Sequence, residues 1–204
     1  MKTRMEIKEH SKALIQSNYW MKVAVIVIYG AILSGVSAAT AGIGALIIVG
    51  PMIIGYNYFF LLSYRTESPD IGVMFNNGFK NFGRNLGGYL WMVLFVYLWS
   101  LLFIIPGIIK SFSYAMTPYI LADSQNVKAQ EALKISMRMM NGHKLDLFVF
   151  YLSFLGWILL SALTFGLLQL FYVGPYMSTS LAGFYEELKI TSIEKGVISE
   201  SELA

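Results

Sequence analysis

The residues of this chain that could do acid–base chemistry are few, and one pair has a useful spacing. The sequence contains no cysteine and two histidines, His10 and His143. Disulfide frameworks, thiolate zinc sites and cysteine nucleophiles are therefore excluded. Asp146 follows His143 by three residues, which puts both side chains on one face of a helix. Hydrolysis would need such a base beside a Ser or Thr. We favour a simpler interpretation, in which a charged cluster with Lys144 fixes a helix at the membrane surface, and predict no enzymatic activity, metal or cofactor.

A second possible chemistry is ligand binding at broken helices. Pro51 and Pro175 lie inside long apolar stretches, and Pro106 lies near Lys110, the one basic residue outside the charged segments. Helix breaks free backbone carbonyls, from which secondary transporters build sites in mid-membrane, and an ionisable residue in a span suggests a functional site. Alternatively, Lys110 extends to the outer membrane surface. The candidate functional residues at helix breaks and polar positions are Pro51, Asn57, Pro106, Gly107, Lys110 and Pro175.

Composition indicates that a membrane must hold these residues in place. The chain has 204 residues, of which 56% are hydrophobic and only 13% charged, and a mean hydropathy of +0.60. Soluble domains carry about a quarter charged residues. Three apolar runs, at 23–64, 87–122 and 145–185, separate the charged segments. Each run is much longer than the roughly 20 residues that one span needs, so each is predicted to form a helical hairpin.

The predicted fold is therefore an all-α polytopic membrane protein with six transmembrane helices in three hairpins. Uncharged breaks at 40–44, 106–107 and 164–166 divide the runs. The spans are expected near 20–40, 44–64, 87–105, 107–122, 145–164 and 167–188 of a single domain, 1–188, followed by a polar cytoplasmic tail, 189–204. All charged segments then face one side, which the positive-inside rule makes the cytoplasm. Both termini are predicted to be cytoplasmic.

Two alternatives to this topology are weaker. The segment 36–38 (Val-Ser-Ala) is like a signal-peptidase site, but the charged region before the first apolar run is long for a signal peptide. The spans could instead be buried helices of a soluble protein. The near absence of charge from 23 to 64 argues against that.

The three hairpins are predicted to be copies of one unit, an amphipathic helix followed by a hairpin. A proline with neighbouring glycine recurs at 50–51, 106–107 and 174–175. Apolar residues at helical spacing predict amphipathic helices near 7–18, 71–82 and 123–141 on the cytoplasmic interface. They would bind anionic lipid or a partner, or would be ordinary loop helices. The candidate interface residues are Lys128, Lys134, Arg138, His143 and Lys144.

Several short motifs carry a resemblance to a known family. They are LFIIPGIIK at 102–110, YILAD at 119–123, EAL at 131–133, MNGHK at 140–144, LSFLGW at 152–157, GPY at 174–176 and FY at 184–185. This combination resembles a family of six-helix integral membrane proteins, found mainly in Gram-positive bacteria and catalogued as a domain of unknown function. More loosely, the pattern is similar to the membrane domain of some bacterial glycerophosphodiester phosphodiesterases. The resemblance implies a bacterial plasma membrane location and brings no catalytic residues.

The function expected from the sequence is non-enzymatic. We expect a multi-pass protein of the bacterial plasma membrane that handles lipid or amphipathic molecules, or that acts as the membrane partner of another protein. Its partners would be membrane lipids or another membrane protein, with no nucleic acid. The alternative is a small transporter or channel whose site is formed by the proline-broken helices. A transporter should bring Lys110, Asn57 or Gln169 to a shared water-filled cavity.

Overall fold

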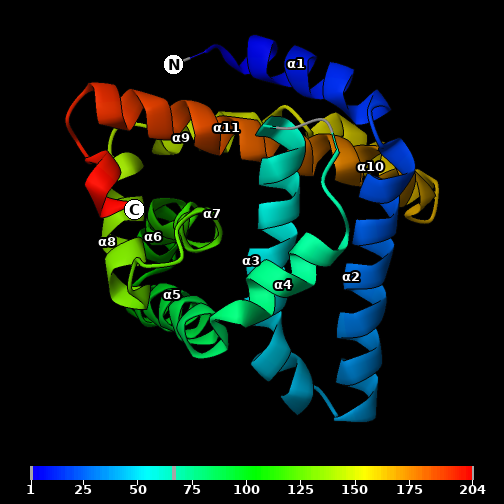
Figure 1. Cartoon of the computed structure of the whole chain (residues 1–204), viewed down its shortest axis with the longest axis horizontal. Coiled ribbons are helices and arrows are strands. Elements are labelled where there is room, and N and C mark those ends of the chain that lie inside the picture. Colours follow the sequence, from blue (N-terminus) through cyan, green and yellow to red (C-terminus); the bar gives the residue numbers. More distant parts are fainter. Residues whose placement is uncertain (1, 66–67, 204) are drawn as a thin grey trace.

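The fold is all-α, as predicted. The computed structural model describes residues 2–65 and 68–203, and every regular element within them is helical (Figure 1). The elements in chain order are α1 (Arg4–Gln16), α2 (Tyr19–Ala39), α3 (Ile43–Arg65), α4 (Gly72–Lys80), α5 (Phe82–Leu102), α6 (Ile104–Tyr114), α7 (Thr117–Asp123), α8 (Ala129–Met139), α9 (Lys144–Leu152), α10 (Leu155–Leu163), the π-helix η1 (Gln169–Val173), α11 (Gly174–Glu194) and the 3₁₀-helix η2 (Glu200–Glu202).

The first predicted hairpin is present as α2 and α3. The Thr40 hydroxyl donates to the Val36 carbonyl at 2.6 Å and accepts from the Gly44 N–H at 2.8 Å, so one side chain closes both helix ends. Ala41 and Gly42 then turn the chain with φ of +49° and +88°. The tight turn needs the left-handed conformation, which glycine adopts without steric cost. The predicted break at 40–44 is thus confirmed.

Six continuous spans are not found among the described residues. Four helical stretches are long and apolar enough to cross a membrane: Tyr19–Ala39, Ile43–Arg65, Phe82–Leu102 and Lys144–Leu163. The predicted fourth span, 107–122, is divided into α6 and α7, because Pro118 cannot donate to the Tyr114 carbonyl and begins a new helix. The hairpin turn is also earlier than predicted. Phe103, with extended backbone, separates α5 from α6, and Pro106 and Gly107 lie in the first turn of α6.

The predicted sixth span, 167–188, is likewise irregular. It begins as the π-helix η1, where the Gly174 N–H donates to the Gln169 carbonyl five residues earlier. Pro175 has no N–H to donate to Phe171, so a regular α-helical pattern cannot pass through this point. The following helix, α11, carries Glu186, Glu187 and Lys189 near its end, which lowers its hydropathy below that of a span. Figure 1 shows α11 lying across the end of α3 and beside α1.

The predicted amphipathic segments form helices α1, α4 and α8. Helix α4 packs closely against α3 through two glycines. A Cβ added at Gly55 would lie 1.8 Å from the Met74 carbonyl oxygen, and one at Gly78 would lie 2.4 Å from the Pro51 carbonyl oxygen. The two backbones are therefore in direct contact. The loop helix α4 is part of the core, because Met74 and Gly78 are buried against α3.

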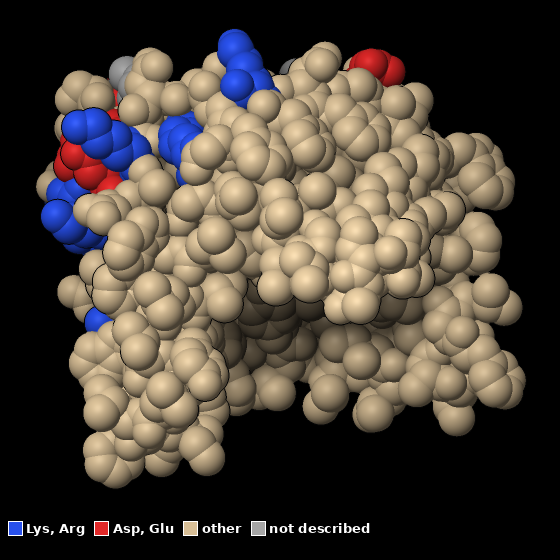
Figure 2. Space-filling model, turned by 90° about the horizontal axis from the view of Figure 1, so that it is seen from below, with Lys and Arg blue, Asp and Glu red and all other residues tan. Residues whose placement is uncertain are grey.

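Charge and exposed apolar surface lie on different parts of the molecule. In Figure 2 the charged residues gather along the upper and left edges of the face, and the rest of that face is uncharged and hollowed. Large apolar side chains are highly exposed at the hairpin turns. Ile43 is 68% exposed, Ile104 75%, Leu163 78% and Phe165 98%. Such surface is unfavourable in water and favourable in lipid, so it supports a membrane protein.

Candidate functional site along helix α8

Two sets of hydrogen bonds define helix α8, one at its N-terminus and one made by a buried serine. The backbone N–H of Lys128 donates to the Glu131 carboxylate at 3.4 Å, which satisfies a donor at the helix start. On the buried face, the Ser136 hydroxyl donates to the Ser113 carbonyl at 2.8 Å and accepts from the Met116 N–H at 3.2 Å. Ser136 therefore fixes α8 against the junction of α6 and α7, where the predicted fourth span is broken.

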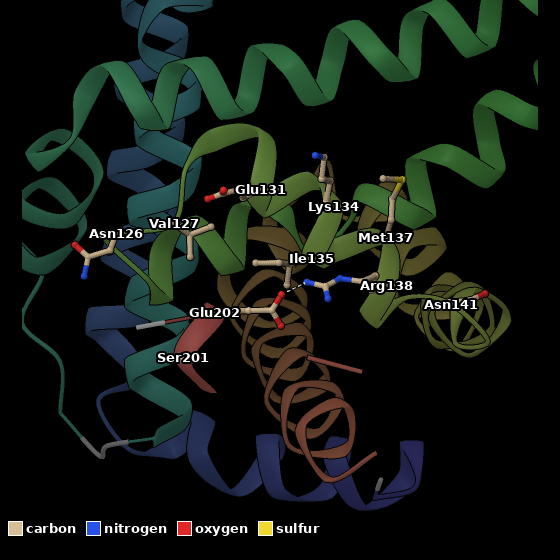
Figure 3. A pocket seen from close by; sticks show the side chains of 10 residues that line it. All are labelled: Asn126, Val127, Glu131, Lys134, Ile135, Met137, Arg138, Asn141, Ser201 and Glu202. Atoms are coloured by element: carbon tan, nitrogen blue, oxygen red, sulfur yellow. Dashed lines mark hydrogen bonds and ion pairs between the residues drawn. The ribbon is translucent and has the colours of Figure 1, made fainter. Parts of the chain in front are cut away.

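A cavity of about 780 Å³ runs along α8 (Figure 3). Figure 3 shows Lys134 and Met137 pointing to one side of this helix, while Arg138 points toward Glu202 of the C-terminal segment. The cavity is thus mixed in character, with both charges and apolar surface. Its lining residues are Asn126, Val127, Glu131, Lys134, Ile135, Met137, Arg138, Asn141, Ser201 and Glu202.

The C-terminal segment closes part of this cavity. Arg138 forms an ion pair with Glu202 at 2.5 Å and donates to the Val197 carbonyl at 3.4 Å. The hydrogen bond from Arg138 lowers the pKa of the Glu202 carboxyl below its usual value. Ile198 and Leu203 are buried beside this polar contact. The guanidinium of Arg138 is therefore already neutralised by the chain itself.

Lys110 reaches the same region from α6. Its Nζ lies 3.9 Å from the Met137 sulfur, and 5.0 Å from the centre of the Trp99 ring. Met137 and Lys134 are one helical turn apart on α8 and line the same cavity. Within residues 2–65 and 68–203, neither Lys110 nor Lys134 forms an ion pair with a carboxylate. Two uncompensated ammonium groups therefore flank Met137 beside the apolar α5–α6 hairpin.

The structure does not bring the other candidate residues together. Pro51 and Asn57 are buried in α3, Pro106 and Gly107 lie in the first turn of α6, and Pro175 is buried at the start of α11. These residues belong to three different predicted hairpins, and Pro51 does not break its helix, because α3 is continuous from Ile43 to Arg65. A Cβ at Gly107 would lie 2.1 Å from the Ser100 hydroxyl, so this glycine allows α5 and α6 to approach.

The remaining interface residues lie at helix ends outside the cavity. Lys128 precedes α8, and His143 and Lys144 begin α9. The His143 Nδ1 lies 2.9 Å from an Asp146 carboxylate oxygen, as the three-residue spacing predicted. Among the described residues no serine or threonine hydroxyl is hydrogen-bonded to the His143 ring. The contact between His143 and Asp146 therefore lies at the start of α9.

The polar groups proposed for a transport site are also separated. Gln169 lines a different cavity, between α2, α3, η1 and α11. Lys110 lies beside α8, and Asn57 is buried within α3 and lines neither cavity. The geometry therefore provides no single cavity that these three side chains share.

One polar cluster was missed by sequence reasoning. The Asp123 carboxylate, 7% exposed, accepts from Arg65 at 2.6 Å, Lys189 at 2.6 Å and the Tyr185 hydroxyl at 3.0 Å. Arg65 also pairs with Glu186. Burial alone raises the pKa of Asp123, but the hydrogen bonds from Arg65 and Lys189 outweigh it and hold that pKa below its usual value.

This cluster, Arg65, Asp123, Tyr185, Glu186 and Lys189, joins the ends of α3, α7 and α11. The sequence does contain a signal for this cluster, because an ionisable residue follows each of the three predicted hairpins, at positions 65, 123 and 189. The spacing of these residues does not show that they meet. Their charges, two positive and one negative, are compatible with a contact.

Comparison with known proteins gives one match. Residues 85–192, from the start of α5 to near the end of α11, match the model of a family described as "Protein of unknown function (DUF975)". No curated protein and no solved structure matches the chain. The matched range includes α8, Lys110 and two of the three chain segments that form the Asp123 cluster.

Proposed function

Because the chain belongs to the DUF975 family, whose function is unknown, we propose its role from its own residues: a non-enzymatic integral protein of the bacterial plasma membrane that binds anionic lipids at α8. In this proposal both termini and α8 lie at the cytoplasmic surface. Lys110 lies on the same side, because its Nζ contacts Met137 of α8, and this differs from the outer-surface position expected from the sequence. Two further statements remain predictions. They are the similarity to the membrane domain of glycerophosphodiester phosphodiesterases and an origin in Gram-positive bacteria.

The observation that carries this proposal is the pair of ammonium groups at Met137. Lys110 belongs to an apolar hairpin and contacts Met137, and Lys134 lies one helical turn from Met137 on the charged helix α8. Ile108 and Ile109 next to Lys110 are 50% and 47% exposed. A headgroup phosphate between the lysines would leave its acyl chains against this apolar surface. The thioether of Met137 adapts to irregular apolar partners.

Removal of both lysines is expected to weaken anionic-lipid binding. Each basic residue near an anionic surface contributes about 1 kcal/mol, so K110Q with K134Q should reduce binding of phosphatidylglycerol roughly 10- to 30-fold at low salt. R138Q should have a smaller effect, because Arg138 is neutralised by Glu202. Binding to purified protein in detergent, measured at low and high salt, checks this.

The matched control is K80Q, which removes an exposed lysine from α4. It should leave binding nearly unchanged. If K80Q weakens binding as much as the α8 double variant does, the interaction is a general response to net positive charge and the α8 site is wrong. An unchanged affinity in the double variant would contradict the site directly.

Topology is tested by cysteine labelling, which the cysteine-free sequence allows. Cysteine at Asn76 or Gln130, both exposed on charged segments, should resist an impermeant thiol reagent added to intact cells. Cysteine at Ile43, in the first hairpin turn, should react. Labelling of residue 76 or 130 from outside would contradict the proposed cytoplasmic side. Labelling of both in permeabilised cells is the control for accessibility.

The transporter alternative remains a prediction without support from the geometry. It needs a shared cavity for its polar groups, and Lys110, Asn57 and Gln169 lie apart. The role as a membrane partner of another protein also remains a prediction. The α8 cavity, partly closed by the C-terminal segment, is the surface that such a partner would meet.

A further inference from the structure

Another concave site lies between the first and third hairpins, away from α8. It has a volume of about 450 Å³, within the roughly 300–1,000 Å³ typical of ligand sites. Four elements form its walls, and every lining residue is uncharged. They are Ile26 and Tyr29 of α2, Tyr56 of α3, Gly166, Gln169 and Leu170 at η1, and Gly174, Met177, Ser178 and Leu181 of α11.

Some polar side chains of this cavity are hydrogen-bonded within the protein, and one is not. At one wall, the Tyr56 hydroxyl and the Ser178 hydroxyl lie 2.6 Å apart and satisfy each other. The Tyr29 and Tyr56 rings pack at 4.9 Å between centres. Gln169 is exposed, and its side-chain amide has no hydrogen-bond partner in the described part of the chain. An unpaired amide costs several kcal/mol in hydrocarbon, so a polar partner at this position is favoured.

The backbone at Gln169 holds the amide at the cavity. The π-helical turn from Gln169 to Val173 is a rare conformation that occurs often at functional sites. Gly174 keeps the wall close to α2, because a Cβ there would lie 3.0 Å from Ile26 Cδ1 and 2.7 Å from the Gln169 carbonyl oxygen. The cavity shape thus depends on the same helix break that interrupts the sixth predicted span.

We propose that this cavity binds one acyl chain of a membrane glycerolipid, with the ester carbonyl of that chain accepting a hydrogen bond from the Gln169 amide. The uncharged walls exclude a charged ligand. Two walls, α2 and α3, belong to helices apolar enough to span a membrane, and in the proposed membrane location the medium around them is hydrocarbon. The site requires no anionic headgroup. It rests on the proposed membrane location and is independent of the two lysines at α8.

The test uses phosphatidylcholine with a photoreactive diazirine in its acyl chain, added to the purified full chain in phosphatidylcholine vesicles. Cross-linked peptides identified by mass spectrometry should come mainly from 26–29 and 166–181. Q169L removes the donor, and L170W fills the cavity. Q169L should lower cross-linking there about fivefold, the effect of one hydrogen bond worth about 1 kcal/mol. L170W should lower cross-linking there as well, because the acyl chain loses its space.

The matched controls are Q130L on α8 and L94W on the exposed face of α5, which should not change the yield at the cavity. Equal cross-linking at 90–97 and in the cavity would show ordinary surrounding lipid and overturn the proposal. Unchanged yields in both Q169L and L170W, with size exclusion confirming folded protein, would also overturn it. A chain that alkaline carbonate extracts from membranes would overturn the membrane proposal itself. Loss of phosphatidylglycerol binding alone would affect only α8.

Discussion

D123N is expected to lower the free energy of unfolding by about 3 kcal/mol. Removal of one partner from a buried ion pair costs about 3–5 kcal/mol, because the other charge stays buried and unpaired. The lower end applies here, since Arg65 and Lys189 side chains are 29% and 24% exposed and Arg65 keeps Glu186. For a chain of this size the melting temperature in detergent should fall by about 6–12 °C.

The matched control is D146N, because Asp146 also accepts from a basic side chain but is 54% exposed. Its melting temperature should change little, as exposed pairs contribute about 0–1 kcal/mol. Equal shifts in D123N and D146N would contradict a structural role for the cluster.

The same cluster predicts a pH dependence. The pKa of Asp123 is lowered in the folded chain, so its contribution is present above the unfolded-state pKa and is lost as pH falls through the lower folded-state pKa. The difference in stability between the native chain and D123N should therefore shrink in acid. Melting curves from pH 7 down to pH 3 measure it. A constant difference would mean that the carboxylate charge is not the stabilising feature.

G55A is expected to be the most damaging methyl addition in the chain. Its Cβ would lie 1.8 Å from the Met74 carbonyl oxygen, and a backbone atom cannot rotate away as a side chain does. Helices α3 and α4 must separate, which also removes the contact at Gly78. Overpacking typically lowers the free energy of unfolding by about 1–3 kcal/mol. Because the clash is with backbone, G55A should lower it by about 3 kcal/mol or more. The fraction of monodisperse protein after detergent extraction should fall sharply.

The control for G55A is G30A. Gly30 lies within α2, and no atom lies within 4 Å of the position its Cβ would occupy. Alanine should be neutral or stabilise the helix by up to about 1 kcal/mol. A similar yield for both variants would mean that α4 does not pack on α3 through these glycines.

Much of the helical arrangement follows from local sequence. Long apolar runs, an uncharged Thr-Ala-Gly turn and helical spacing predict α2, α3, α4, α5 and α8. These signals are local, because helix formation and turn chemistry depend on neighbouring residues. Two predictions are wrong because of prolines. The predicted break at 106–107 is instead the first turn of α6, where proline is tolerated. The predicted fourth span is interrupted at Pro118, since proline ends a helical pattern.

The candidate site was only partly predictable. Lys134 and Arg138 were found from the charged face of α8, but the amphipathic pattern could not show that Glu202 neutralises one and leaves the other free. Lys110 was identified as unusual from its isolation in the sequence. Its contact with Met137 joins residues 27 positions apart, and such contacts depend on packing that no local pattern encodes.

The Asp123 cluster also sets an order of events during synthesis. Its members are made far apart in time, with Arg65 first, Asp123 58 residues later and Lys189 a further 66 residues on. Chains grow from the N-terminus, so Arg65 is available to the Asp123 carboxylate before Lys189 has been synthesised. The last hairpin must be in place before the charge balance is complete. The cluster is therefore complete only after the α11 segment has been synthesised and packed against α3 and α7.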